Sequence, residues 1–234
     1  IDTPGFFDFA GEVEEGISAA GAAIIVVNGK AGVEVGTKKA WDLCEKYKLP
    51  RMIYVSNMDV DNASFRQVVE DMTAMFGKKM APFHLPIREN EKFVGYINVI
   101  TETGNRWQGK EVTECEVPDY NKPNLQICRD TLMESVAETS EDMMERYFNG
   151  EVFSEAEIRA ALRTNVCDGS IVPMTMGSNT LCQGMYTLLD DIIKYFPSPE
   201  NRVVAGINMK TSDIYHADYD FSKAKSAYIW KTIV

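Results

Sequence analysis

Residues 22–27 read Ala-Ala-Ile-Ile-Val-Val, and residues 51–55 repeat the pattern as Arg-Met-Ile-Tyr-Val. The first run is continuously apolar, as expected for a strand covered on both faces of a sheet, and the second is also predicted to be a buried strand. Apolar residues at helical spacing lie between the two runs, over residues 40–47, and again after the second, over residues 65–76. Strand, helix, strand and helix joined by short connections predict a parallel sheet wrapped by helices.

The same alternation continues toward both ends of the chain. Glu12–Ala20 is predicted to be a short helix before the first strand, and Ile171–Thr175 a further buried strand. Leu181–Tyr195 has the apolar spacing of a helix. The prolines in Pro197–Pro199 end that helix, because a proline ring cannot continue it.

The middle of the chain has a different character. Residues 84–100 predict a hairpin with its turn at Glu89–Glu91, and Val112–Val117 extends the β pattern. Three helical patterns follow, at Leu125–Ala137, Glu141–Phe148 and Ser154–Leu162. Together these segments predict an inserted α+β subdomain.

We therefore expect three regions. Residues 1–80 and 165–200 form an α/β domain with a mostly parallel sheet and flanking helices, and residues 81–164 form the inserted α+β subdomain. Residues 201–234 begin as a polar linker, and Ala227–Val234 is the first strand of a following module.

Composition restricts the class of function. The chain of 234 residues has 24 basic and 35 acidic side chains and a net charge of −11, which excludes extensive coating of nucleic acid but leaves local contact with RNA open. Its five cysteines are scattered without a C-x-x-C pair, so neither a disulfide framework nor a zinc site is expected. The longest apolar run is too short to span a bilayer. Because the chain does not begin with Met, we expect it to have been cut from a longer one.

Asp2-Thr3-Pro4-Gly5 is the first of three candidate loops that follow strands. A nucleotide-hydrolysing site uses an Asp in such a loop to hold a water bound to Mg²⁺, and a Gly whose backbone N–H approaches the γ-phosphate. The same four residues also suit an ordinary tight turn. On these residues alone, the turn is the better interpretation.

The other two candidate loops follow the second and third predicted strands. In Ser56-Asn57-Met58-Asp59 the carboxylate can accept both N–H donors of a guanine edge, which adenine does not offer. In Gly177-Ser178-Asn179-Thr180 small polar residues can meet the carbonyl of the base. A polar turn and a helix cap are the respective alternatives.

The order of these loops, with the sequence around them, resembles the GTP-binding domain of translational GTPases of the elongation factor G family. The resemblance covers roughly residues 1–200 and includes Gly29–Glu34, Leu85–Ile87 and Asp190–Pro199. The tetracycline-resistance ribosomal protection proteins share this layout and are the nearest relatives. The resemblance implies a P-loop-NTPase-type sheet, an inserted subdomain and, at the C-terminus, entry into a β-barrel domain.

The resemblance also implies ligands and partners. In the parent protein it implies GTP or GDP, and Mg²⁺ held through a water by Asp2. It further implies local contacts with ribosomal RNA and protein, no binding to DNA or membrane, and a monomer in the cytoplasm. The residues that it implies for nucleotide binding are Asp2, Thr3, Pro4, Gly5, Ser56, Asn57, Asp59, Ser178 and Asn179.

Four departures from the family pattern bear on the mechanism. No G-x-x-x-x-G-K-[ST] phosphate loop occurs, because the chain starts downstream of its position. Phe6 stands at the position of the family's catalytic His, and a phenyl ring cannot orient water as an imidazole does. Ser56 and Asn57 replace the Asn and Lys of N-K-x-D, and Asn179 replaces a small Ala.

Two hypotheses follow. The first is a ribosome-associated, elongation-factor-G-like GTPase, of which this chain is a piece with weak or absent nucleotide binding. The alternative is a degenerate, non-hydrolysing module that binds the ribosome or another factor. An intact phosphate loop upstream of Ile1 would favour the first hypothesis.

Overall fold

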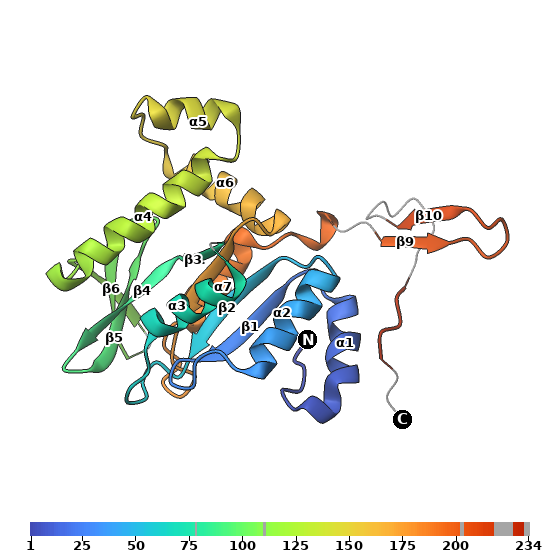
Figure 1. The fold of residues 1–234 in the computed structure, drawn as a ribbon, viewed down its shortest axis with the longest axis horizontal. Coiled ribbons are helices and arrows are strands. Elements are labelled where there is room, and N and C mark those ends of the chain that lie inside the picture. The colour runs from blue at the N-terminus through green and yellow to red at the C-terminus, as the bar shows by residue number, and fades with distance from the viewer. Residues whose placement is uncertain (78, 110, 202–203, 218–226, 232–234) are drawn as a thin grey trace.

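A four-stranded parallel sheet lies at the centre of the computed structural model, which describes residues 1–77, 79–109, 111–201, 204–217 and 227–231. Its strands run in the order β1-β2-β8-β3 (Figure 1). The bounds of the strands are Ala23–Asn28 for β1, Arg51–Ser56 for β2, Val172–Met176 for β8 and Met80–Pro82 for β3. This arrangement confirms the predicted parallel sheet, and every residue of β2 and β8 is buried.

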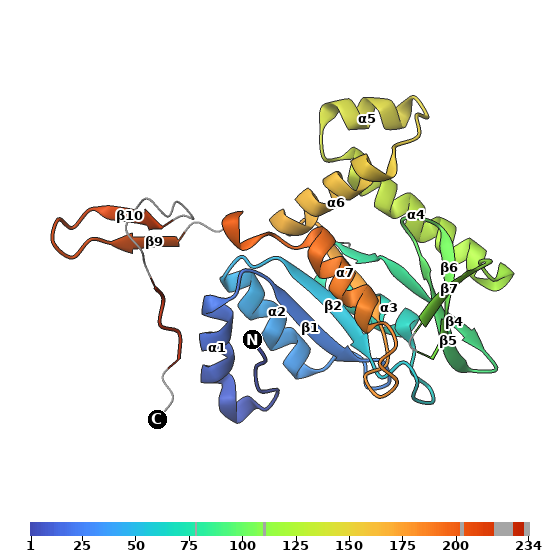
Figure 2. The same ribbon diagram turned by 180° about the vertical axis from the view of Figure 1, so that it is seen from behind.

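Helices cover both faces of this sheet. Their bounds are Ala10–Ala19 for α1, Val35–Lys46 for α2, Phe65–Phe76 for α3 and Met185–Tyr195 for α7, and a 3₁₀ turn, η1, spans Phe7–Phe9. α2 and α3 lie over one face (Figure 1), where Trp41 stacks on Phe76 with ring centroids 4.2 Å apart. α7 lies over the opposite face, as the view from behind shows (Figure 2).

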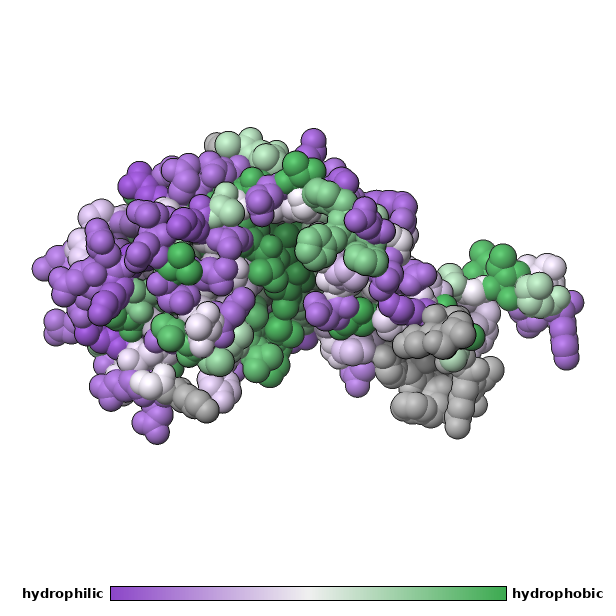
Figure 3. Space-filling model, turned by 90° about the horizontal axis from the view of Figure 1, so that it is seen from below, coloured by the Kyte–Doolittle hydropathy of each residue, from purple (hydrophilic) through white to green (hydrophobic). Residues whose placement is uncertain are grey.

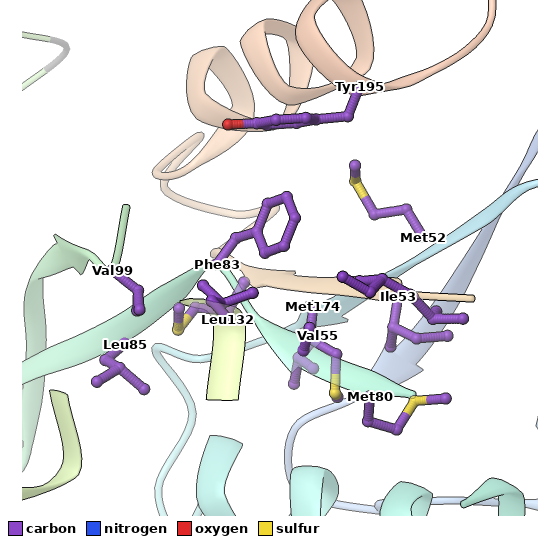
Figure 4. Packing of buried hydrophobic residues seen from close by; sticks show 14 of the residues in the cluster. Met52, Ile53, Val55, Met80, Phe83, Leu85, Val99, Leu132, Met174 and Tyr195 are labelled. Atoms are coloured by element: carbon purple, nitrogen blue, oxygen red, sulfur yellow. The ribbon is translucent and has the colours of Figure 1, made fainter. Parts of the chain in front are cut away.

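The core continues from the parallel sheet into the inserted subdomain. Figure 4 shows Tyr195 of α7 lying over Phe83, with Met52 of β2 beside them. The rings of Phe83 and Tyr195 meet edge to face, with centroids 4.9 Å apart. Backbone hydrogen bonds from Phe83 N to Met174 O and from Val99 N to Phe83 O connect the two sheets. The two sheets therefore share one apolar core.

The inserted subdomain is an antiparallel sheet with helices, as predicted. Its strands are β4 (His84–Glu89), β5 (Lys92–Asn98), β6 (Thr103–Gln108) and β7 (Glu111–Cys115), in sequential order. The helical elements that follow are η2 (Asp119–Asn121), α4 (Lys122–Ala137), α5 (Glu141–Phe148) and α6 (Glu155–Asp168). Ser154 and Glu157 form the capping box of α6, which satisfies N–H groups at the helix start.

The C-terminal region differs from the expectation. The predicted linker contains η3 (Pro199–Asn201) and a hairpin of β9 (Val204–Ile207) and β10 (Ile214–Ala217), which projects away from the rest of the molecule (Figure 1). The strand predicted over Ala227–Val234 is not formed by residues 227–231, which have no regular secondary structure, and residues 232–234 lie outside the described part.

Further comparisons with the sequence prediction concern two strands, the start of α7, the cysteines and membrane-spanning helices. β3 and β6 were not predicted, and α7 begins at Met185 rather than Leu181. All five cysteines are free thiols, as expected. Within the described ranges, no helix combines the length and the hydropathy that crossing a membrane requires.

Candidate functional site

The loops that follow β1, β2 and β8 meet at one edge of the parallel sheet. Gly29 N donates to Ser56 O at 2.8 Å, which joins the loop after β1 to the loop after β2. Met58 N donates to Gly177 O at 3.1 Å, which joins the loop after β2 to the loop after β8. Because the carboxyl ends of parallel strands share an edge, the second and third candidate loops come together as the topology predicts.

Close contact between these loops requires a glycine in the first of them. A Cβ added to Gly29 would lie 3.0 Å from Met58 Sδ and 3.0 Å from Ser56 O. Asn28 closes the same turn, since its Oδ1 accepts hydrogen bonds from Lys30 N and Ala31 N. The loop after β1 thus supports the loop after β2 through backbone contact.

The loop after β2 presents one unsatisfied carboxylate oxygen. Ser56 is buried, and its Oγ donates to Val27 O at 3.3 Å. Asn57 is half-buried with a φ of 57°, a left-handed conformation that Asn tolerates better than most residues. Asp59 is half-buried, and its Oδ1 is inaccessible to solvent without a hydrogen-bond partner. A buried acceptor without a protein partner is free to accept a hydrogen bond from a ligand donor.

The loop after β8 is a tight turn with a buried serine. Ser178 is fully buried and exchanges backbone hydrogen bonds with Gln183. Its Oγ accepts from Leu181 N at 3.0 Å, whereas Asn179 is exposed. A Cβ on Gly177 would lie 2.3 Å from Gln183 O and 2.3 Å from Tyr54 Oη, so this position also requires glycine.

Tyr54 lies beneath these loops and was not predicted as a site residue. Its hydroxyl is buried without a partner, as is Oε1 of Gln183. Burial raises the pKa of Tyr54, and the negative charge of Asp59 raises it further. The phenol therefore stays neutral beside Asp59 and keeps a free O–H donor. A polar group within the otherwise apolar run of β2 was the available signal.

The first candidate loop lies apart from the other two. Asp2 and Gly5 are exposed, Thr3 and Pro4 are half-buried, and no hydrogen bond found among the described residues connects this loop to the site around Asp59. It packs instead on α1, where Thr3 Cγ2 would lie 2.8 Å from a Cβ on Gly16.

Phe6 follows that loop and is 77% exposed. Its backbone oxygen accepts from Phe9 N, which closes the 3₁₀ turn before α1. The ring projects into solvent and has no polar atom with which to orient water.

The residues fit part of what a guanine nucleotide and a hydrated Mg²⁺ require. Asp59 offers a buried acceptor for the base, and Asp2 offers an exposed carboxylate that can accept from a metal-bound water. A Cβ on Gly5 would meet nothing within 4 Å, so its backbone is open to approach by a phosphate.

Comparison with known proteins identifies the family of this chain. Residues 1–198 match the family model described as the elongation factor Tu GTP binding domain. The chain is 32% identical over 237 residues to elongation factor G 1 of Syntrophomonas wolfei, a match that covers 100% of this chain and 35% of that protein. It is 34% identical over 219 residues to elongation factor G of Neorickettsia sennetsu, which covers 92% of this chain and 32% of that protein.

A solved structure supports the same relationship. A crystal structure of a protein from Thermus thermophilus superposes with a TM-score of 0.80 at 34% identity, over 86% of this chain and 30% of that chain. The chain thus spans about a third of the length of the relatives that it matches. On the matched domain, the sequence identity and the shared α/β fold, the chain belongs to the GTP-binding domain family of translational GTPases, within the elongation factor G group.

Proposed function

We propose that the full-length protein binds GTP and GDP at the sheet edge formed by the loops after β2 and β8, and that it hydrolyses GTP during translation. The observation that carries this proposal is the buried, unpartnered Oδ1 of Asp59 between these loops. Guanine offers two adjacent N–H donors to a carboxylate, and adenine does not. Asp59 therefore selects guanine, with one charge-assisted hydrogen bond to each donor.

The surrounding residues complete the proposed base site. The turn at Ser178 and Asn179 faces the carbonyl edge of the base, and Ser56 and Asn57 shape the loop that carries Asp59. Loss of the family's Asn and Lys from this loop weakens nucleotide binding, because a lost buried hydrogen bond costs about 1–3 kcal/mol.

The phosphates are proposed to lie toward Asp2-Thr3-Pro4-Gly5. The Gly5 N–H approaches the γ-phosphate, and Asp2 accepts from a water bound to Mg²⁺. When bound, Mg²⁺ neutralises charge that develops on the phosphate oxygens. Thr3 and Pro4 fix the loop on α1, since Thr3 packs against Gly16.

The proposed partner is the ribosome, contacted in the cytoplasm by a monomer through local contacts with RNA and protein. The family relationship supports this assignment. The net charge of −11 argues against broad coating of RNA or DNA and favours small contact areas. No binding to a membrane is proposed.

Phe6 favours a second candidate function. An exposed phenyl ring at the position of the family's catalytic His leaves the attacking water without its usual hydrogen-bond partner. In that case the protein binds GTP and the ribosome without turnover and acts as a degenerate binding module.

Nucleotide titration and turnover of the full-length protein test both functions. Binding of GDP with no measurable binding of ADP supports the proposed base site, and equal affinity for the two contradicts it. GTP hydrolysis that purified ribosomes accelerate supports the enzyme. Tight guanine nucleotide binding without hydrolysis, with or without ribosomes, supports the binding module instead.

A further inference from the structure

Arg88 connects the inserted antiparallel sheet to the loop that carries Asp59. Its Nη2 donates to Met58 O at 2.9 Å and to Ala63 O at 2.8 Å. Met58 immediately precedes Asp59, and Ala63 ends the loop before α3. One guanidinium nitrogen therefore holds both ends of the loop 58–63 together.

Besides Arg88, two hydrogen bonds hold the ends of this loop, from Met58 N to Gly177 O at 3.1 Å and from Ser64 N to Gly29 O at 2.8 Å. Its internal backbone hydrogen bonds are Val60 N to Asn57 O at 3.2 Å and Ala63 N to Val60 O at 3.2 Å. Asn57 and Asn62 both have positive φ, which costs free energy for residues other than glycine. A loop in such a conformation persists only when surrounding contacts hold it, and Arg88 supplies two of them.

Arg88 is itself held in place by three contacts. The Tyr120 hydroxyl accepts from Arg88 N at 3.0 Å and donates to Arg88 O at 2.8 Å, while Nη1 of Arg88 donates to Glu91 O at 2.7 Å. The strand register shifts between Ile87 and Arg88, which marks a β-bulge. Bulges redirect side chains out of the regular alternation, and they are common beside functional sites.

The chemistry of arginine suits this role. A guanidinium is planar and stays charged, and its fork of N–H groups can serve several carbonyl oxygens in a fixed geometry. Burial lowers the pKa of Arg88, but arginine remains protonated at all physiological pH values. A lysine has a single nitrogen on a flexible stem and holds the same acceptors less rigidly.

We propose that Arg88 is a positioning residue for base recognition, which fixes the loop 58–63 so that the Asp59 carboxylate faces the base. This inference rests on the proposed role of Asp59 in binding guanine. It also makes the inserted sheet part of the proposed nucleotide site, because a side chain of β4 holds the loop that carries Asp59.

The test uses Arg88→Met and Arg88→Lys in the full-length protein, with Arg129→Met as the matched control. Arg129 also donates to backbone oxygens of the inserted subdomain, at Val99 and Ile100, but it does not contact the loop 58–63. Hydrogen exchange of amides 58–63 reports the order of the loop, and titration with GDP and xanthosine diphosphate reports base recognition.

We expect Arg88→Met to accelerate exchange in the loop and to weaken GDP binding about tenfold, with partial rescue in Arg88→Lys. Arg129→Met should change neither quantity, even if it lowers the melting temperature equally. Loop exchange and GDP affinity that match those of Arg129→Met would overturn the inference.

Failure of the proposed function gives a different result. If Asp59→Asn leaves the preference for GDP over xanthosine diphosphate unchanged, Asp59 does not read the base, and the role of Arg88 in recognition fails with it. If Asp59→Asn alters the preference and Arg88→Met affects neither exchange nor affinity, only the inference about Arg88 is wrong.

Discussion

Asp59 is the residue on which the proposed base recognition rests. Its Oδ1 is buried without a partner, and Asn at this position would present an N–H donor or a single carbonyl oxygen instead of a carboxylate. Xanthine has a carbonyl where guanine has an amino group, so the amide donor suits xanthine. Asp59→Asn should therefore weaken GDP binding roughly ten- to a hundredfold and strengthen binding of xanthosine diphosphate.

Competition titrations of the full-length protein with the two nucleotides measure this change in the ratio of affinities for GDP and xanthosine diphosphate. Asp61→Asn is the matched control, because Asp61 lies exposed in the same loop. An unchanged ratio of the two affinities in Asp59→Asn would exclude Asp59 from the base site.

Phe6 is the residue that separates the two proposed functions. The side chain is 77% exposed, so a histidine fits in its place without repacking. A histidine nitrogen can hydrogen-bond to the attacking water, and positioned groups of this kind contribute roughly a hundredfold or more to rate. Phe6→His should therefore raise ribosome-stimulated GTP hydrolysis by at least about tenfold with little change in GTP affinity.

Phe9→His controls for a new imidazole at a nearby aromatic position that is also exposed. Equal hydrolysis by Phe6→His and the original protein, in the presence of ribosomes, would mean that other groups position the water or that the chain is not catalytic.

At the scale of elements, α7 and β4 meet through a buried polar pair. His84 Nδ1 lies 3.1 Å from Thr175 Oγ1 and 3.4 Å from Asp191 Oδ2, and both titratable side chains are almost fully buried. Burial lowers the pKa of His84 to about 3 and raises the pKa of Asp191 to about 8. Between these values the pair holds a single proton.

The sign of the pH dependence follows from the unfolded pKa values, 6.5 for His and 3.8 for Asp. Between pH 3.8 and pH 6.5 the unfolded chain also holds one proton, on His84. The pair therefore adds no pH dependence to the free energy of unfolding in this range. Above 6.5 the unfolded chain loses this proton while the folded pair keeps its own, on Asp191 or shared, until about pH 8. Stability contributed by the pair therefore falls as pH rises from 6.5 to 8, by up to about 2 kcal/mol.

Asp191→Asn should remove this loss, which urea unfolding at pH 6.5 and pH 8 measures. The other groups that face the pair are Lys194, Asp190 and Tyr195 on α7 and the phenol of Tyr96 on β5. Asp190→Asn is the control, since Asp190 is exposed on the same helix. An equal decline in stability between the two pH values in Asp191→Asn would show that the pair does not titrate in this range.

Elements with a strong apolar pattern were predictable, and those defined by tertiary contact were not. The runs that became β1, β2 and β8 are rich in apolar residues, so the pattern was sufficient to find them, although only β2 and β8 are buried throughout. β3 has three residues and exists because it pairs with β8. β6 is largely polar and carries no alternation, and the late start of α7 follows from Gly184, whose φ is 83°.

In the candidate site, too, some features were predictable from the sequence and others were not. Loops at strand ends could be predicted from order and composition, because parallel strands place their carboxyl ends together. The roles of Tyr54 and Arg88 depend on contacts between distant segments, such as the 30 residues that separate Arg88 from Met58. No local pattern encodes such contacts.

At the scale of the whole molecule, several apolar side chains are exposed. Figure 3 shows hydrophobic side chains gathered in a hollow in the middle of the face that it draws. β1 pairs on one side only among the described residues, and its Val26 is 59% exposed. Ile193 on α7 is 75% exposed. An open strand edge and exposed apolar residues are typical of surfaces that other polypeptide covers.

The nucleotide affinity of the 234-residue chain depends on which parts of the nucleotide its residues can contact. In the proposed site, Asp59 and the turn at Ser178 contact the base, whereas most affinity for a nucleoside triphosphate comes from backbone N–H groups and a lysine that cradle the phosphates. The sequence has no G-x-x-x-x-G-K-[ST] segment to supply that cradle. We expect this chain to bind GTP more weakly than about 1 µM in calorimetric titrations. Because the base contacts alone would survive in the 234-residue chain, its weak binding should still favour GTP over ATP. Submicromolar GTP affinity in this chain would mean that residues 1–234 hold the phosphates without such a cradle, with Asp2-Thr3-Pro4-Gly5 as the first segment to mutate.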